Sequence, residues 1–350
     1  MVDATAQALQ QQQERESTTT SRSITEITTV DELIAKVKRY VGIVHTLRHD
    51  GLVRWFVEYP PPISATSDTV PVLILLHFGG GNMRSSRVLG RTLEKDLWLV
   101  LAEQNGYLVL APNGVAPRKR RGGYNTRAFE SDWNDYNGGP NGVIADIDDV
   151  GFISALVDWA IQERNGNPKR IYIYGYSNGG TMTERMIIER PNMFAAAAAA
   201  VANLPEKEVP IPSRGTPFFL ICGTVDPIIP YNGGKANAGR GMVRSAETTR
   251  DFFVAANHAG PDMIETILPN VDPNDNCTII SQFFPSNTTP VQFYIMNGGG
   301  HNFLGKKMIG GLNYFPRIVS YFLDDYLGNP CYDANGLLLA WTFLTNFTLQ

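Results

Sequence analysis

Cysteine is scarce in this sequence. The three that occur in 350 residues, Cys222, Cys277 and Cys331, are too few and too scattered to predict a disulfide scaffold or a zinc site. No apolar run approaches the roughly 18 residues that a membrane span needs. Lysine and arginine number 30 against 34 aspartates and glutamates, for a net charge of −4. No basic surface of the kind that binds nucleic acids is therefore expected.

Apolar patterning is also missing from the start of the chain. Residues 1–30 hold a glutamine run at 10–13 and serines and threonines at 17–21. Such a segment cannot bury enough apolar surface to offset its ordering entropy. It also lacks the apolar centre of a secretory signal. We expect residues 1–42 to be a polar tail with a short helix near 32–41, followed by a catalytic domain at 43–326 and an extension at 327–350.

The chain is 43% apolar, and several of its apolar runs have the length of buried strands. Residues 43–47 and 52–57 flank His49-Asp50-Gly51, and Asp-Gly predicts a hairpin because it tolerates positive φ. Six apolar runs of strand length follow, at 70–76, 107–111, 171–174, 194–201, 218–222 and 291–296. Continuous apolar runs are typical of strands covered on both faces, as in a parallel sheet.

Helical patterns alternate with these runs, at 146–164, 181–190, 245–257 and 315–326. The alternation predicts an α/β fold: a doubly wound, mostly parallel sheet with helices on both faces. Asp146, Asp148 and Asp149 open the first helix, where the helix dipole favours acids, although a metal site is an alternative. The apolar stretch 337–344 predicts an element packed on the body, with a membrane-surface contact as the alternative.

A G-x-S-x-G pattern stands between a strand and a helix, at Gly175-Tyr176-Ser177-Asn178-Gly179. The pattern has a steric cause, since the turn is so tight that its flanking positions tolerate no side chain. The turn would raise the Ser177 hydroxyl above the sheet edge. The alternative is an ordinary glycine-rich turn.

A nucleophilic serine needs a base and an orienting acid, which follow it in the order acid, then histidine, in this type of fold. Only His258 and His301 come late enough. His258 is explained by the end of a helix, whereas His301 follows a strand and three glycines, so we assign His301 as the base. Asp226 follows the 218–222 strand and is the predicted acid. Asp262, Asp272 and Asp275 lie in a long polar stretch.

The tetrahedral intermediate of such a reaction needs backbone N–H donors. One is expected from Asn178, the residue after the nucleophile. Another is expected from Gly79 or Gly80, in the loop after the 70–76 strand. The residues leave the choice between these two glycines open. His77 is expected to be structural.

Six segments resemble the polyhydroxybutyrate depolymerase and feruloyl esterase branch of the α/β-hydrolase superfamily. They are 77–81, Trp133-Asn134, 148–152, 175–180, 223–234 and His301 with its glycine run. The resemblance covers residues 43–326, and the 223–234 segment is the most specific. It strengthens the assignment of Asp226. It implies a serine carboxylesterase acting on polyesters, short-chain esters, or feruloylated and acetylated polysaccharides, with no cofactor or metal.

The residues that depart from the pattern of that family are ones we expect to contact the substrate. Phe78 replaces a usual glycine, and Phe303 stands where a Trp-Pro pair is common. We assign both, with Trp133, to substrate binding. Trp133 could equally pin its loop to the core. The basic run 118–121 is either solvated surface or an attraction for an anionic substrate.

Two other functions remain open. A prolyl-oligopeptidase-type peptidase shares the triad, but 42 residues before the first strand leave no room for a propeller. A catalytically silent binding protein would not need the triad. The family resemblance favours secretion, as do three N-x-S/T triplets at 276, 287 and 346, but no export signal is found. The sequence gives no expectation for the oligomeric state.

Overall fold

The computed structural model describes residues 42–61, 69–83, 93–117, 123–128, 130–260, 262–302 and 326–350. These residues belong to one compact unit, residues 41–350. The expected N-terminal tail, the basic run 118–121, Phe303 and nearly all of the helix expected at 315–326 lie outside the described residues.

The predicted hairpin is present as β1 (Ile43–His49) and β2 (Leu52–Tyr59), paired antiparallel. Asp50 and Gly51 form its two-residue turn, with φ of 46° and 70°. Positive φ at both central residues matches the right-handed twist of the flanking strands. The Asp-Gly signal therefore places this turn correctly.

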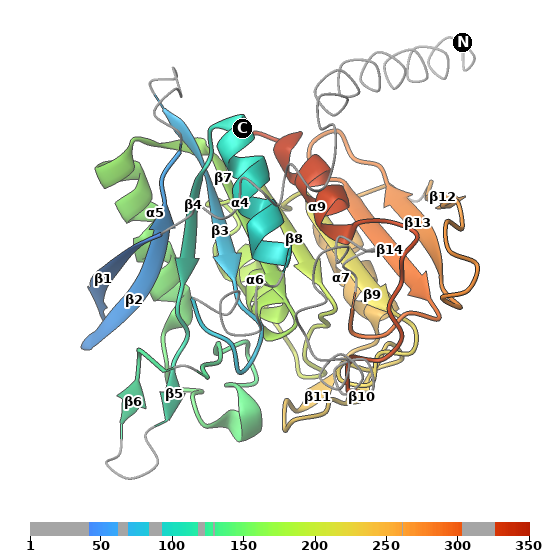
Figure 1. The fold of residues 1–350 in the computed structure, drawn as a ribbon, viewed down its shortest axis with the longest axis horizontal. Helices are drawn as coiled ribbons and strands as arrows, with labels where there is room; N and C mark the ends of the chain where they lie inside the picture. The colour runs from blue at the N-terminus through green and yellow to red at the C-terminus, as the bar shows by residue number, and fades with distance from the viewer. Residues whose placement is uncertain are drawn as a thin grey trace. The chain divides into compact units, whose positions relative to one another are not determined.

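A ten-stranded sheet runs through the unit in the order β1-β2-β4-β3-β7-β8-β9-β14-β13-β12 (Figure 1). Its six central strands are parallel neighbours and include all six predicted apolar runs. They are β3 (Val70–Leu76), β4 (Leu108–Pro112), β7 (Gly166–Tyr176), β8 (Ala196–Ala200), β9 (Phe218–Gly223) and β14 (Val291–Asn297). Antiparallel strands flank them on both sides.

Helices pack on both faces, as predicted. Figure 1 shows α4 (Leu93–Asn105) and α9 (Gly336–Thr345) in front of the sheet, where they contact each other. Three further helices of the described residues contact strands from the opposite side: α5 (Asp149–Arg164), α6 (Asn178–Glu189) and α7 (Ala246–Ala256). Short elements complete the unit: η1 (Pro140–Gly142), the pair β5 (Ala116–Pro117) and β6 (Tyr124–Asn125), and the pair β10 (Gly234–Lys235) and β11 (Met242–Val243).

Two antiparallel strands that the sequence did not predict, β12 (Ile264–Ile267) and β13 (Thr278–Phe284), lie within and just after the long polar stretch. Polar residues within both strands interrupt the apolar runs from which the other strands were predicted. Gln282 in β13 is buried, and its amide donates to Glu265 while its carbonyl oxygen accepts from Arg250. Since these partners satisfy its amide, Gln282 can occupy a buried strand position.

The segment 327–350 packs against the sheet through α9. Leu337, Ala340 and Leu344 are buried, and the Trp341 ring lies 4.8 Å from that of Tyr107. No helix in the described ranges is long and apolar enough to cross a membrane.

A disulfide joins Cys277 to Cys331 across a sequence separation of 54 residues. The scattered spacing of the cysteines led us to expect no disulfide framework, and a single bridge of this kind was missed. The two cysteines come together because residues 327–331 return to the loop before β13. Cys222 is free and buried at the end of β9.

Removal of this disulfide should destabilise the fold. Cys277→Ser/Cys331→Ser should lower the free energy of unfolding by about 2–4 kcal/mol, because the bridge restricts a long loop in the unfolded chain. Denaturant titrations of the variant and wild type measure the difference. Thiol titration of the unfolded, unreduced wild type should detect one thiol. Detection of three would show that the bridge is absent.

Candidate active site

Ser177 occupies the turn between β7 and α6, with φ of 55° and ψ of −124°. A Cβ on Gly175 would lie 2.0 Å from the Gly179 carbonyl oxygen, and one on Gly179 would lie 2.5 Å from that of His77. Both glycines are therefore steric requirements, as the G-x-S-x-G pattern predicts. The positive φ of Ser177 is a strained conformation of the kind that collects at functional sites.

Asp226 and His301 form a buried pair, with 2.6 Å between Oδ2 and Nδ1. The other carboxylate oxygen, Oδ1, accepts the N–H groups of Ile228 and Ile229 at 2.7 and 2.8 Å. Since Asp226 is fixed from both sides, it favours the tautomer in which His301 Nδ1–H donates. Nε2 of His301 is then left with the lone pair that a general base needs.

The two loops that carry this pair follow neighbouring parallel strands, β9 and β14. A Cβ on Gly223 would lie 2.2 Å from the Gly300 carbonyl oxygen, so the loops interlock backbone to backbone. On the other side, the His301 N–H donates to the Leu327 carbonyl at 2.6 Å and that of Gly300 to the Asn329 carbonyl at 2.7 Å. The segment after residue 326 thus supports the histidine loop.

Tyr176 links the nucleophile turn to the histidine. Its hydroxyl donates to the His301 carbonyl, and its ring lies edge-on to the imidazole at 5.3 Å. The structure thereby brings His301 beside the Ser177 turn. The described residues hold no direct hydrogen bond between the Ser177 hydroxyl and His301, a bond that often tightens only when substrate binds. His258 follows α7 and is exposed.

The candidate oxyanion donors lie at the ends of β7 and β3. Asn178 opens the first turn of α6, where backbone N–H groups have no partner within the helix. The Gly80 N–H donates to Ser131 O at 3.0 Å and to Asp132 Oδ1 at 3.1 Å. Gly79 packs against Arg240, since a Cβ there would lie 1.8 Å from Nη2. Gly80 therefore already has acceptors within the protein.

The three residues predicted to bind substrate differ in how exposed their side chains are and in whether the structure describes them. Trp133 is fully buried, and its indole N–H donates to the His77 carbonyl at 2.9 Å. Trp133, predicted either to stack on a substrate or to pin its loop to the core, therefore has no exposed face for a substrate in this structure, and its indole bond holds the loop to the residue after β3. Phe78 is partly exposed, with its ring 6.3 Å from that of Tyr176. Phe303 lies outside the described residues.

Two acids are buried close to the nucleophile turn. Burial, together with the charge of Asp135, raises the pKa of Glu184 in α6 well above its usual range. Burial also raises the pKa of Asp135, although a hydrogen bond from Asn178 opposes the shift. Both carboxyl oxygens of Glu184 lack a hydrogen-bond partner in the part of the chain described. Burial without a hydrogen-bond partner therefore favours the uncharged form of Glu184 in the folded protein.

The three acids at the start of α5 have separate partners. Asp146 accepts from the Tyr124 hydroxyl, and Asp148 caps the helix by accepting the Gly151 N–H at 2.8 Å. Asp149 is buried in an ion pair with Arg54, 2.5 Å between Oδ1 and Nη2. Within the described ranges, no three His, Cys, Asp or Glu side chains are grouped as metal ligands would be.

The strand order, the turn at Ser177 and the two loops after β9 and β14 define an α/β-hydrolase fold. Residues 99–209, which include this turn, match the model of the prolyl oligopeptidase family.

Similar proteins carry esterase names. The chain is 28% identical to "Putative esterase NocK" of Nocardia uniformis subsp. tsuyamanensis over 49% of this chain and 52% of that one. It is 26% identical to feruloyl esterase B of Piromyces equi, over 47% of this chain and 31% of that one. The match thus spans about half the length of the first relative and less of the second. These names support the resemblance to the feruloyl esterase branch.

Among solved structures, an acetyl xylan esterase from Aspergillus awamori aligns with a TM-score of 0.48 and 14% identity. The alignment covers 74% of this chain and 94% of that one.

Replacement of the buried acid should change how stability depends on pH. Above pH 4.5, the usual pKa of a glutamate, Glu184 ionises in the unfolded chain, whereas the raised pKa in the folded chain delays its ionisation to higher pH. The unfolded state then binds fewer protons, so wild-type stability falls as pH rises, by up to about 1.4 kcal/mol per pH unit. Glu184→Gln cannot ionise and should escape this loss.

Urea unfolding of both proteins between pH 4 and 8 measures the difference. The matched control is Glu163→Gln, at an exposed glutamate on α5. A stability difference between Glu184→Gln and wild type that stays constant with pH would contradict a raised pKa of Glu184 in the folded protein.

Proposed function

We propose that this chain is a serine carboxylic-ester hydrolase that works through an acyl-enzyme. The observation that carries the proposal is the buried Asp226–His301 pair, held beside the strained Ser177 turn by Tyr176. A histidine fixed in one tautomer by a buried carboxylate is the arrangement that activates a serine hydroxyl. The esterase names of the similar proteins add support.

In the proposed reaction, Ser177 Oγ attacks the ester carbonyl while His301 Nε2 takes its proton. The oxyanion receives the Asn178 N–H and a second donor from the loop after β3. Gly79 is our choice for that donor, because the Gly80 N–H already donates to Ser131 and Asp132. His301 returns its proton to the departing alcohol, and water then hydrolyses the acyl-enzyme by the same two steps.

The proposed substrates are short-chain esters, polyesters, and feruloyl or acetyl esters of polysaccharides. Feruloyl and acetyl groups are suggested by the names of the similar proteins. The partly exposed Phe78 ring, edge-on to Tyr176, would border the acyl side of the site. A panel of p-nitrophenyl esters, methyl ferulate, acetylxylan and polyhydroxybutyrate film on one preparation ranks these classes.

A peptidase is the second candidate, favoured by the match of residues 99–209 to the prolyl oligopeptidase family. It uses the same triad and differs in the bond that is broken. Prolyl p-nitroanilide peptides added to the same panel discriminate the two. Turnover of these peptides above that of every ester would favour the peptidase.

Loss of a triad member should nearly abolish turnover. Ser177→Ala and His301→Ala should each reduce kcat on p-nitrophenyl acetate by roughly 10⁴- to 10⁶-fold. Asp226→Asn should cost up to about 10⁴-fold, because the amide no longer holds the required tautomer. Steady-state kinetics on folded variants, with circular dichroism as the folding check, measures these losses.

The control for this series is His258→Ala, which removes an exposed histidine after α7 and should leave kcat within twofold of wild type. A fluorophosphonate probe should label wild type and fail to label Ser177→Ala. A catalytically silent protein would not be labelled at all, and near-full activity of Ser177→Ala would rule out the proposal.

A further inference from the structure

Residues 131–135, here called the strap, run beside both ends of the candidate oxyanion site. We infer that the strap is a positioning element that sets the spacing between the two oxyanion donors, with Trp133 at its centre. This inference rests on the proposed function. No residue of the strap is assigned to contact substrate.

The strap first binds the loop after β3. Ser131 and Gly81 pair as an isolated β-bridge, and the Ser131 hydroxyl also donates to the Gly81 carbonyl at 2.9 Å. Asp132 Oδ1 accepts from Gly80 at 3.1 Å and from Arg240 at 2.7 Å. These contacts hold both the backbone beside Gly79 and the guanidinium packed on it.

Trp133 then joins this loop to the nucleophile turn. Its indole N–H donates to the carbonyl of His77, where β3 ends. Its backbone binds the Asn178 amide at two points: the Trp133 N–H donates to Oδ1 at 2.8 Å, and Nδ2 donates to the Trp133 carbonyl at 3.1 Å. Nδ2 also donates to Asp135 at 2.7 Å. One residue therefore bonds to both segments that would carry the oxyanion donors.

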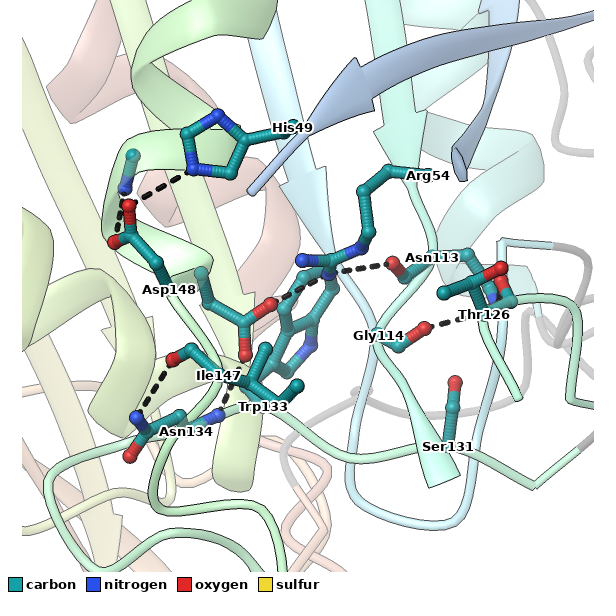
Figure 2. A network of polar contacts seen from close by, with 12 residues as sticks. His49, Arg54, Asn113, Gly114, Thr126, Ser131, Trp133, Asn134, Ile147 and Asp148 are labelled. Atoms are coloured by element: carbon teal, nitrogen blue, oxygen red, sulfur yellow. Dashed lines mark hydrogen bonds and ion pairs between the residues drawn. The ribbon is translucent and has the colours of Figure 1, made fainter. Parts of the chain in front are cut away.

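The strap is itself anchored in the core. The Asn134 N–H donates to Asp149 Oδ2 at 2.7 Å, and Asp149 Oδ1 pairs with Arg54. Figure 2 shows the Asn134 side chain bonded to the Ile147 carbonyl, and Arg54 bonded to the Asn113 carbonyl. Because Arg54 and Asp149 are almost wholly buried, water cannot replace either partner. The strap is therefore held at Asn134 by a buried ion pair that is itself fixed in the core.

Such a strap would act on the transition state rather than on substrate binding. Oxyanion donors are effective only at hydrogen-bond distance from the developing charge, and a displacement of about 1 Å can cost up to 10²-fold in rate. The substrate's other contacts would be unchanged. Loss of a strap bond should therefore lower kcat and leave KM nearly constant.

Trp133→Phe tests the inference, since it removes the indole N–H while it keeps an aromatic ring in place. The matched control is Trp98→Phe. Trp98 is equally buried, and its indole N–H has no hydrogen-bond partner among the described residues. Trp133→Phe should reduce kcat on p-nitrophenyl acetate by about 10- to 100-fold with KM within twofold of wild type. Trp98→Phe should keep kcat within twofold.

Asn178→Ala provides a second, independent variant, because it keeps the backbone N–H donor and removes only the side chain that the strap holds. It should show the same fall in kcat, with slower inactivation by the fluorophosphonate probe. In the double variant the losses should be less than multiplicative, because both bonds serve one geometry. If Trp133→Phe does not fold, as judged by thermal denaturation, the kcat of Asn178→Ala is the measurement that tests the inference.

Wild-type kcat in folded Trp133→Phe or Asn178→Ala, or equal losses in Trp133→Phe and Trp98→Phe, would overturn the inference. These results would leave the proposed function intact, because that function is tested separately by the activity of Ser177→Ala, by labelling of the wild type with the probe and by the substrate panel.

Discussion

The site depends on a close approach between two pieces of backbone. The first turn of α6 lies against the end of β3 so tightly that a methyl group on Gly179 would lie within 2.7 Å of the carbonyl oxygens of both Leu76 and His77. This contact places the serine turn beside the loop that follows β3, and both then face the same edge of the sheet. Everything proposed for the oxyanion presupposes that spacing. A single added carbon atom would force the two segments apart.

Buried polar groups in this protein differ in how many hydrogen-bond partners they have. The Arg54–Asp149 pair makes further bonds from Asn134 and to Asn113, which fix its position, and only Nε of Arg54 lacks a partner among the described residues. Both carboxyl oxygens of Glu184 lack a partner among the described residues, and burial raises the pKa of this group, which favours its neutral form. A hydrophobic residue of similar size would avoid this desolvation cost. Burial of Glu184 therefore lowers the stability of the folded protein, and it does so in α6, the helix that follows the Ser177 turn.

Much of the fold could be predicted from the sequence, because strands buried on both faces are continuous apolar runs and a tight turn allows only glycine. Chain order could then assign a histidine and an acid, and the structure pairs these two side chains. Contacts between distant residues were not predictable. The Tyr176–His301 bond joins residues 125 apart in the sequence, and the disulfide joins residues 54 apart. Trp133 was open to two interpretations because sequence does not show which way a loop aromatic points.

The support of the histidine loop by residues 327–331 has a consequence for synthesis. Ribosomes release the chain from its N-terminus, so Ser177 and its turn emerge well before the carbonyls of Leu327 and Asn329, which accept the N–H groups of His301 and Gly300. Until those acceptors have emerged, the His301 loop lacks the two backbone bonds that the C-terminal segment supplies. The Ser177 turn is therefore synthesised early and the support of the His301 loop late, so the proposed site can be completed in a nascent chain only after Ser177, Asp226 and His301 have all been made.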